Sequence, residues 1–480
     1  MNASIKFGTD GWRAIVGEKF NEGNLSRVAA AFASYLQEKK VSNKPVAIGF
    51  DGRKDSNNYA RLFAEILSER DINVYLSSSI IPTPVLSYAV KQLQCSSGIM
   101  ITASHNPSNY NGVKFKASYG GPFMSEETRL IEQFVRDDVN PLQRSDKRIT
   151  VTDFLPDYCE HLKTIIDFSA LQHFASRPDS NASVMIDSMG GAGQTILEDI
   201  LTRLGWRAQT IFGEPEHRFY DRSPEPIEKN LGPLLYNTRV TDAVLGLATD
   251  GDADRCSVVY EDGKWMTAQE NALALLWHLH ENKKWNGAVI KSASVTDKVR
   301  MLAERWNEKT YDVSVGFKYI TEVMLKEDFM FGAEESGGFG FKNHLPERDG
   351  IAAGLMFAEM IALSGKSLYR IMDDIRGMVG ELQYDRVDVP YDKPDRGEIL
   401  SELKSRHIPS LGKYAVGSIS TFEENGTSTG IKFFCGDSRW LLIRSSQTEP
   451  LVRIYAEGQT GDEVKEFLEE GKRLITLPKV

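Results

Sequence analysis

Short hydrophobic runs alternate along this chain with longer stretches in which hydrophobic residues recur every three or four positions. Residues 25–40 have this helical spacing, and residues 45–53 (PVAIGFDGR) predict a buried strand that ends at Gly52. A second helix at about 57–70 and a second strand at 72–77 follow. Alternating strands and helices are typical of an α/β domain with a mostly parallel sheet.

The pattern that begins this unit, a predicted strand followed by a turn, recurs twice along the chain. VMIDSMGGAG at 184–193 and AVIKSASVT at 288–296 each predict a strand that runs into a turn. The C-terminal part differs, because its strand-like segments RVDVPY, GIKFFC, WLLIRSS and PLVRIYAE precede one helix-like segment. We therefore predict an α/β fold of three related mixed-sheet α/β modules plus a C-terminal α+β domain, with a linker at 140–150 and a hinge near 372–382.

Length, charge and cysteine content narrow the class of protein. A chain of 480 residues is too long to fold around a single hydrophobic core, and this length predicts about three domains. A net charge of −10 disfavours a large nucleic-acid-binding face. The sequence has no signal-peptide pattern and no apolar run of about 18 residues, so we expect no membrane association. The four scattered cysteines predict neither disulfides nor a thiolate zinc site, and a cytoplasmic location is the simplest expectation.

The first candidate for chemistry is the segment GIMITASHNPSNYNGVKF at 98–115. A predicted strand delivers Ser104 to a polar turn, and strand ends are where ligands gather in α/β sheets. In an extended chain Ser104 and the adjacent His105 would point to opposite sides, which argues against a protease-like pair. Ser104 therefore resembles a hydroxyl displayed for phosphorylation, with Lys114 available to neutralise charge or move a proton. The alternative is a serine that caps a helix.

The second candidate is DGDADR at 250–255, which follows a predicted buried strand. Asp250, Asp252 and Asp254 would repel one another unless a cation or protons intervene, and hard oxygen ligands suit Mg²⁺. An EF-hand fits poorly, because Arg255 stands where its loop needs glycine. An aspartyl-phosphate enzyme with Asp250 as the nucleophile is the more serious alternative.

Three further loops carry polar groups suited to a sugar phosphate. GAEESGG at 332–338 offers Glu334 and Ser336 for sugar hydroxyls. Arg444 is followed by a run of hydroxyl and amide side chains that could cradle a phosphate, with Arg453 close behind. FGTDGWR at 7–13 contributes two glycines and Arg13.

Taken in this order, these segments resemble the α-D-phosphohexomutase superfamily of phosphoglucomutases and phosphomannomutases. TASHNP at 102–107 is similar to its phosphoserine loop, and DGDADR to its metal loop. GAEESGG is similar to its sugar-recognition loop, and RSSQTEP at 444–450 to its phosphate-binding loop. The segments FGTDGWR, IPTP, VGFKYI and ERDGI also match recurring family segments, so that the resemblance covers essentially the whole chain.

The resemblance implies four domains around a central cleft. They are a phosphoserine domain (1–148), a metal-binding-loop domain (149–258), a sugar-recognition domain (259–372) and a phosphate-binding domain (373–480). It further implies a catalytic set, a metal set and a substrate set. The catalytic set is Ser104, Lys114, Arg13 and His105. The metal set is Ser104, Asp250, Asp252 and Asp254. The substrate set is Glu334, Ser336, Lys318, Arg444, Ser446, Gln447, Thr448 and Arg453.

Two departures from the family pattern concern these loops. Ser445 and Gln447 stand where many members carry Pro and Gly or Asn, a change that a phosphate loop can accept. Gly338 stands where several bacterial members carry a histidine thought to assist proton transfer, which leaves the general acid/base open.

The expected activity is interconversion of hexose 1-phosphate and hexose 6-phosphate, for glucose or mannose, through phospho-Ser104. Expected cofactors are Mg²⁺ and a hexose 1,6-bisphosphate, and the expected partners are hexose phosphates alone, with a monomer or small homo-oligomer as the assembly. A phosphatase or mutase that uses Asp250, and a non-catalytic sugar-phosphate-binding protein, stay as alternatives.

Overall fold

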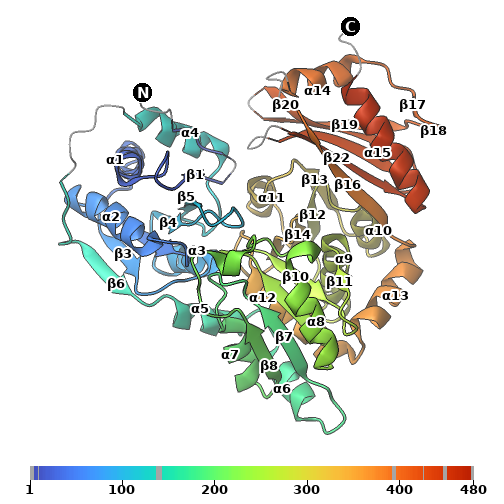
Figure 1. Ribbon diagram of the computed structural model, residues 1–480, viewed down its shortest axis with the longest axis horizontal. Coiled ribbons are helices and arrows are strands. Elements are labelled where there is room, and N and C mark those ends of the chain that lie inside the picture. Colours follow the sequence, from blue (N-terminus) through green and yellow to red (C-terminus); the bar gives the residue numbers. More distant parts are fainter. Residues whose placement is uncertain are drawn as a thin grey trace.

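A computed structural model of the protein describes residues 5–8, 10–136, 143–391, 396–424, 426–446 and 451–476. The described residues form four larger sheets and a two-stranded sheet of β17 and β18. In Figure 1 the N-terminal sheet lies on the left, the second sheet at the bottom and the C-terminal sheet at the upper right.

The first sheet has the strand order β1-β5-β4-β2-β3-β6. Its strands are β1 Trp12–Ile15, β2 Val46–Phe50, β3 Val74–Ser77, β4 Ser97–Ile101, β5 Tyr110–Ala117 and β6 Ile149–Thr152. The helices of this part of the chain are α1 Glu22–Glu38, α2 Ser56–Glu69, α3 Thr83–Gln92 and α4 Ser125–Phe134. Strands β4, β2, β3 and β6 run parallel, and β5 and β1 complete the other edge in antiparallel pairs.

The second sheet has the order β11-β10-β9-β7-β8, and the third has the order β13-β12-β14-β15. The second sheet contains β7 Ser183–Asp187, β8 Arg207–Ile211, β9 Leu245–Thr249, β10 Cys256–Val259 and β11 Trp265–Met266. Its part of the chain forms the helices α5 Leu155–Leu162, α6 Phe168–Ser176, α7 Ile196–Arg203, η1 Phe219–Asp221, η2 Glu228–Asn230 and α8 Gly232–Val240. The third sheet contains β12 Ala288–Ser292, β13 Thr310–Val313, β14 Phe329–Ala333 and β15 Phe339–Phe341. The helices that accompany it are α9 Ala268–Glu281, α10 Asp297–Arg305, α11 Phe317–Met324, α12 Gly350–Ser364 and α13 Leu368–Val379.

The three sheets share one connectivity. In each, a central strand (β2, β7 or β12) pairs in parallel with the next two strands of the module, and the last of these pairs with an antiparallel strand (β5, β10 or β15). The three recurring openings in the sequence correspond to these central strands. The predicted fold class, with three related mixed-sheet modules, is therefore confirmed.

The C-terminal domain has the predicted α+β character. Its antiparallel sheet has the order β16-β22-β21-β20-β19. Its elements are β16 Gln383–Pro390, α14 Arg396–Ser405, β17 Ser410–Leu411, β18 Tyr414–Ala415, β19 Ser418–Glu424, β20 Thr427–Phe434, β21 Trp440–Ser445, β22 Leu451–Gly458 and α15 Gly461–Ile475.

Two of the predicted domain boundaries fall inside elements, and a third separates a strand from its sheet. Strand β6 follows the boundary at 148 but pairs with β3 of the first sheet. The boundary at 258 lies inside β10, and the boundary at 372, with most of the predicted hinge, lies inside α13. Hydrophobic periodicity identifies a strand but not its pairing partner, so the sequence could not place these divisions. Part of the predicted linker, residues 140–142, is outside the described residues.

The hydrophobic core is shared by the three modules, whereas the C-terminal domain has a separate one. One continuous cluster runs from Ala47 in the first module to Val379 at the end of α13. All four cysteines are free. Within the described residues no single helix has the length and apolar character to cross a membrane, and only the bent pair α12 and α13, at 84°, passes that test jointly.

Buried charges join the third module to the C-terminal domain. Lys432 Nζ donates to Ala293 O at 2.9 Å and lies 3.3 Å from Asp297 Oδ1. Glu457 Oε2 accepts from the Asp297 amide at 3.1 Å and from Trp440 Nε1 at 3.0 Å. Burial and the negative charge of Asp297 raise the pKa of Glu457 to about 7.

This joint predicts a pH-dependent stability. Glu457 has an ordinary pKa of 4.5, so the folded state retains its proton between pH 4.5 and about 7 while the unfolded state loses it, and stability falls as the pH rises through this window. The loss is up to about 3 kcal/mol. In Glu457→Gln, the melting temperature measured by scanning calorimetry should change less between pH 5 and 7 than in the wild type. Glu463→Gln is the control, because Arg439 lowers the pKa of Glu463 to about 2. An unchanged slope in Glu457→Gln would contradict the assignment.

Candidate active site

Three turns at equivalent places in the three modules hold the site. Ser104 lies between β4 and β5, the aspartates lie between β9 and β10, and Glu334 lies between β14 and β15. Each turn begins at the carboxyl end of a parallel strand, where α/β sheets present ligand-binding loops. The three repeats therefore each contribute one loop of the site.

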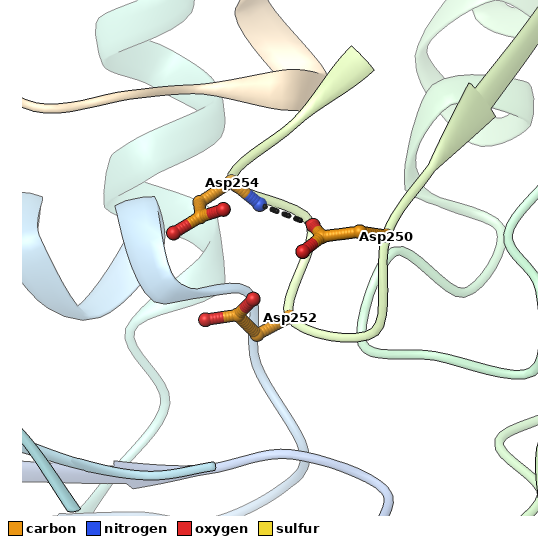
Figure 2. Close-up of side chains that lie close together, drawn as sticks. All are labelled: Asp250, Asp252 and Asp254. Carbon is orange, nitrogen blue, oxygen red and sulfur yellow. Dashed lines mark hydrogen bonds between the residues drawn. The ribbon is translucent and has the colours of Figure 1, made fainter. Parts of the chain in front are cut away.

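The three aspartates, for which the sequence predicts a bound Mg²⁺, lie close together (Figure 2). They are fully buried, and one oxygen from each lies within 4.8 Å of the others. Asp250 Oδ1 accepts from the amides of Asp254 at 3.0 Å and Arg255 at 3.2 Å. Burial and the charges of Asp252 and Asp254 raise the pKa of Asp250 well above its ordinary value.

The residues present fit a divalent cation. Asp252 Oδ1 and Asp254 Oδ1 are buried carboxylate oxygens without a hydrogen-bond partner. Such orphan acceptors are costly unless a cation or donor satisfies them. All-oxygen ligand sets of this kind suit Mg²⁺.

Ser104 lies directly against this group. Its Oγ donates to Asp250 Oδ2 at 2.9 Å, and its side chain is 1% exposed. The predicted opposite orientation of Ser104 and His105 is wrong, because Ser104 has a φ of 51° rather than an extended backbone, and His105 Nδ1 lies 3.4 Å from Ser104 Oγ. Burial and the charges of Arg255 and Arg13 lower the pKa of His105 well below its ordinary value, so the ring is neutral near pH 7. No helix follows Ser104, which removes the helix-cap interpretation.

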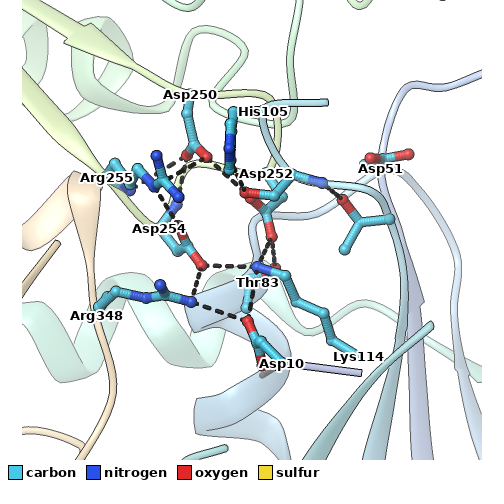
Figure 3. A network of polar contacts seen from close by, with 12 residues as sticks. Asp10, Asp51, Thr83, His105, Lys114, Asp250, Asp252, Asp254, Arg255 and Arg348 are labelled. Carbon is cyan, nitrogen blue, oxygen red and sulfur yellow. Dashed lines mark hydrogen bonds and ion pairs between the residues drawn. The ribbon is translucent and has the colours of Figure 1, made fainter. Parts of the chain in front are cut away.

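Lys114 links the aspartates to the first module (Figure 3). Its Nζ lies 2.7 Å from Asp252 Oδ2, 2.8 Å from Asp254 Oδ2 and 3.3 Å from Asp10 Oδ2. Burial opposes its charge, but these carboxylates outweigh burial and raise the pKa of Lys114. Lys114 is therefore a permanent cation and a donor, not a base.

The sequence did not indicate several residues of this network. Thr83 of IPTP donates to Asp252 Oδ2 at 2.5 Å, and its amide donates to Asp252 O at 2.9 Å. Arg348 of ERDGI contacts Asp254 Oδ2 at 2.7 Å and Asp10 Oδ2 at 3.0 Å. Both segments had matched recurring family segments, and that match was the available signal.

The sugar-recognition loop meets Arg348 as well. Glu334 is 5% exposed, and its Oε2 lies 3.3 Å from Arg348 Nη1. A Cβ at Gly338 would lie 2.4 Å from Arg348 Cδ, so the arginine occupies the space that a side chain at 338 would need. Ser336 is half-buried on the same turn. A histidine at 338 would therefore collide with Arg348 in its present position.

Two predicted residues have contacts beside this network. Arg13 Nη1 donates to Asn106 Oδ1 at 2.8 Å, which places it on the serine loop. Lys318 donates to Ser125 Oγ at 2.7 Å and to Glu424 Oε1 at 2.6 Å. Lys318 therefore joins three parts of the fold: α4, α11 and β19.

The remaining predicted residues lie on the C-terminal sheet. Arg444 and Arg453 face each other on adjacent strands, and Arg453 Nε is 3.6 Å from Asp388 Oδ2. Like charges directly opposite are unfavourable, which favours an anion between them. In the described part of the chain Ser104, Lys114 and the three aspartates form no hydrogen bond or ion pair with either arginine. Ser446 follows β21 and is buried, whereas Gln447 and Thr448 are outside the described residues.

Replacing Gly251 by alanine tests how closely the loop 250–255 must approach the loop 102–107. A Cβ there would lie 2.4 Å from Ser104 O, which is backbone and cannot yield without moving the loop. A misplacement of about 1 Å costs about 10²-fold in rate, so Gly251→Ala should lower kcat by that order. Gly232→Ala in the same module, where a Cβ meets nothing within 4 Å, should leave kcat unchanged. Equal kcat values for the two variants would contradict this close approach.

Comparisons with known proteins agree with this arrangement. Four family models, described as phosphoglucomutase/phosphomannomutase domains I, II, III and C-terminal domain, match residues 4–141, 156–263, 269–377 and 402–473 in that order. The matches cover the three turns of the site and most of the C-terminal domain.

Individual relatives extend over almost the whole chain. A crystal structure from Thermus thermophilus, assigned as a phosphomannomutase, is 33% identical with a TM-score of 0.83 and covers 99% of this chain and 100% of that one. A protein of Methanosphaera stadtmanae, assigned as a phosphoglucosamine mutase, is 29% identical over 95% of this chain and 94% of its own. The N-acetylphosphoglucosamine mutase of Aspergillus fumigatus, in complex with GlcNAc-6P and magnesium, has the same fold at 14% identity, with a TM-score of 0.56 over 98% of this chain and 95% of that one.

Proposed function

Because this chain belongs to the phosphoglucomutase/phosphomannomutase family, whose enzymes are isomerases, we propose that it interconverts hexose 1-phosphates and hexose 6-phosphates with Ser104 as the phosphate carrier. The observation that carries the proposal is the hydrogen bond from Ser104 Oγ to Asp250 Oδ2 at 2.9 Å, inside a buried group of three carboxylates. A phosphoryl group on Ser104 would face these carboxylates, and its two negative charges would require a cation between them.

The residues of the site fit successive roles in the transfer. Asp250, Asp252 and Asp254 would hold Mg²⁺, which when bound neutralises phosphoryl charge. Lys114 would donate to the transferring group, because its pKa is raised. Phosphoryl transfer depends mainly on such positioning and charge neutralisation.

In the forward half-reaction, the bond between phosphorus and Ser104 Oγ breaks as a free sugar hydroxyl takes the phosphoryl group. The hydroxyl proton passes to a base, and neutral His105, 3.4 Å from Ser104 Oγ, suits that role and would then pass the proton to the departing Ser104 oxygen. The bound hexose 1,6-bisphosphate then turns, and its other phosphate returns to Ser104.

The substrate contacts come from the other loops. Glu334 and Ser336 would bind sugar hydroxyls, and Lys318 would line the sugar site after exchanging its present bond to Glu424. Arg444, Ser446, Gln447, Thr448 and Arg453 would hold the phosphate that does not react, while Arg13 lies beside the transferred one. Glu334, Glu335 and Ser336 can all accept hydrogen bonds from sugar hydroxyls, and we propose glucose and mannose ahead of amino sugars as the substrates.

An aspartyl phosphate at Asp250 is less well supported. Asp250 Oδ1 already accepts from two backbone amides, and Oδ2 accepts from Ser104.

A coupled assay tests the proposal. Glucose 1-phosphate, mannose 1-phosphate and glucosamine 1-phosphate are supplied in turn with a trace of the matching bisphosphate. We expect turnover of glucose 1-phosphate or mannose 1-phosphate that stops with a chelator and returns with Mg²⁺. The protein-bound phosphate should be acid-stable and resist hydroxylamine. Hydroxylamine-labile phosphate would indicate Asp250, turnover of glucosamine 1-phosphate alone would overturn the sugar assignment, and binding without any turnover would indicate a non-catalytic protein.

A further inference from the structure

One buried guanidinium holds the whole loop that carries Ser104. Arg53 follows strand β2 and is 3% exposed. Its Nη2 donates to Ser104 O at 2.6 Å and Asn106 O at 2.6 Å, and its Nη1 donates to Pro107 O at 2.8 Å and Tyr110 O at 3.0 Å. Four carbonyl groups of one turn therefore share one side chain.

These bonds hold a conformation that the chain would not retain by itself. Ser104 has a φ of 51°, a left-handed backbone that is unfavourable for a residue other than glycine. Residues 102–109 form turns rather than a helix or strand, so their carbonyls lack the regular partners of secondary structure. A buried carbonyl without a partner costs about 1–3 kcal/mol. The Arg53 guanidinium supplies donors to Ser104 O and Asn106 O, and it gives a second donor to Pro107 O, which also accepts from the Tyr110 amide at 3.0 Å.

The guanidinium is itself fixed from two sides. Arg53 Nε lies 3.2 Å from Asp51 Oδ2, while Asp51 Oδ1 accepts from the Arg53 amide at 3.0 Å and from Ser56 Oγ at 2.8 Å. From the second module, the ring of Phe219 lies over the guanidinium at 4.7 Å. The planar fork of arginine suits this rigid arrangement, and lysine cannot reproduce it.

The Ser104 carbonyl lies between Arg53 and the metal loop. Arg53 donates to this oxygen, and the backbone of Gly251 packs so closely against it that a Cβ would come within 2.4 Å. A shift of Arg53 would therefore move Ser104 relative to Asp250.

We propose that Arg53 is a positioning residue that holds the Ser104 loop in its left-handed conformation, with Oγ directed at the aspartates. The proposal rests on the proposed function of Ser104 as the phosphate carrier. Arg53 touches neither the reacting oxygen nor a sugar site, and it acts through the backbone of the loop. Its loss should slow phosphoryl transfer without weakening the hold on the distant phosphate.

The test compares Arg53→Lys with Arg27→Lys. Arg27 is also a buried arginine of the first module, at 7% exposed, and donates to Arg136 O at 2.6 Å away from the site. Single-turnover phosphorylation of Ser104 by glucose 1,6-bisphosphate, kcat, KM and the melting temperature are measured for both. Arg53→Lys should lower the phosphorylation rate and kcat by about 10- to 100-fold with KM changed less than about threefold, since misplacement of about 1 Å costs about 10²-fold. Arg27→Lys should retain wild-type rates.

Other outcomes would separate the two claims. If both variants lose the same thermal stability and Arg53→Lys keeps wild-type rates below its melting temperature, the role of Arg53 is structural and the proposal is wrong. If Arg53→Lys does not fold, Asp51→Asn provides a second measurement, because it keeps Arg53 but weakens the contact that holds it. Wild-type rates in Asp51→Asn would also overturn the proposal. Retained turnover in a variant without the Ser104 hydroxyl would instead refute the proposed function.

Discussion

Replacing Ser104 by alanine should lower kcat by at least about 10⁵-fold, which is the scale observed when a nucleophile is removed from an enzyme. The variant has no hydroxyl to carry the phosphoryl group, so neither half-reaction can occur. Its contacts to the distant phosphate and the sugar hydroxyls involve other loops, and affinity for hexose phosphate should change little. The measurements are kcat in the coupled assay, phosphate incorporation from glucose 1,6-bisphosphate, and substrate affinity by calorimetry.

The stability of the Ser104→Ala variant should barely change. One buried hydrogen bond, to Asp250 Oδ2, is lost, which corresponds to about 1 kcal/mol. Ser87→Ala is the matched control, because Ser87 is also fully buried in the first module and its Oγ has no hydrogen-bond partner. Ser87→Ala should keep wild-type kcat. A Ser104→Ala enzyme with more than about 1% of wild-type kcat would show that another group carries the phosphate.

The sequence predicted the fold class and singled out the loops with Ser104 and the three aspartates, because hydrophobic pattern and residue type are local properties. Buried strands are visible as hydrophobic runs, so β2, β7 and β12 could be identified as related openings. The equivalence of the three site-bearing turns was not predicted, because it depends on which strand pairs with which. For the same reason the predicted boundary at 148 lies before β6, because its pairing with β3 cannot be seen in the sequence.

Residues that act through contacts across the fold were the hardest to predict. Thr83 and Asp252 are 169 positions apart, and Arg348 and Asp10 are 338 apart, so no spacing rule connects them. The sequence analysis placed Arg53 at the end of the segment 45–53 and predicted no role for it. The orientation of His105 was predicted wrongly because a left-handed Ser104 cannot be seen in a run of residue types.

Replacing Lys114 by methionine should lower kcat by about 10³-fold, because the variant loses a fixed cation beside the transferring phosphoryl group. The side chain is 1% exposed, and methionine has nearly the same length, so the change removes charge rather than volume. Substrate affinity at the distant phosphate loop should be retained. Steady-state kinetics in saturating Mg²⁺ measure the loss. Lys298→Met is the control, because Lys298 is also buried but donates to Val379 O at 2.8 Å, and it should keep kcat within about threefold of wild type.

Lys114→Met should also make folding depend more strongly on Mg²⁺. Removal of the ammonium takes away its contacts with Asp252 Oδ2 at 2.7 Å and Asp254 Oδ2 at 2.8 Å, so that Asp252 Oδ2 keeps only the neutral Thr83 hydroxyl and Asp254 Oδ2 keeps Arg348. Removing one partner of a buried ion pair costs about 3–5 kcal/mol. A bound divalent ion would compensate part of this charge. The rise in melting temperature on adding Mg²⁺ to chelator-treated protein should therefore be larger in Lys114→Met than in wild type. Equal rises would show that the carboxylates facing Lys114 and the ion do not share one electrostatic site.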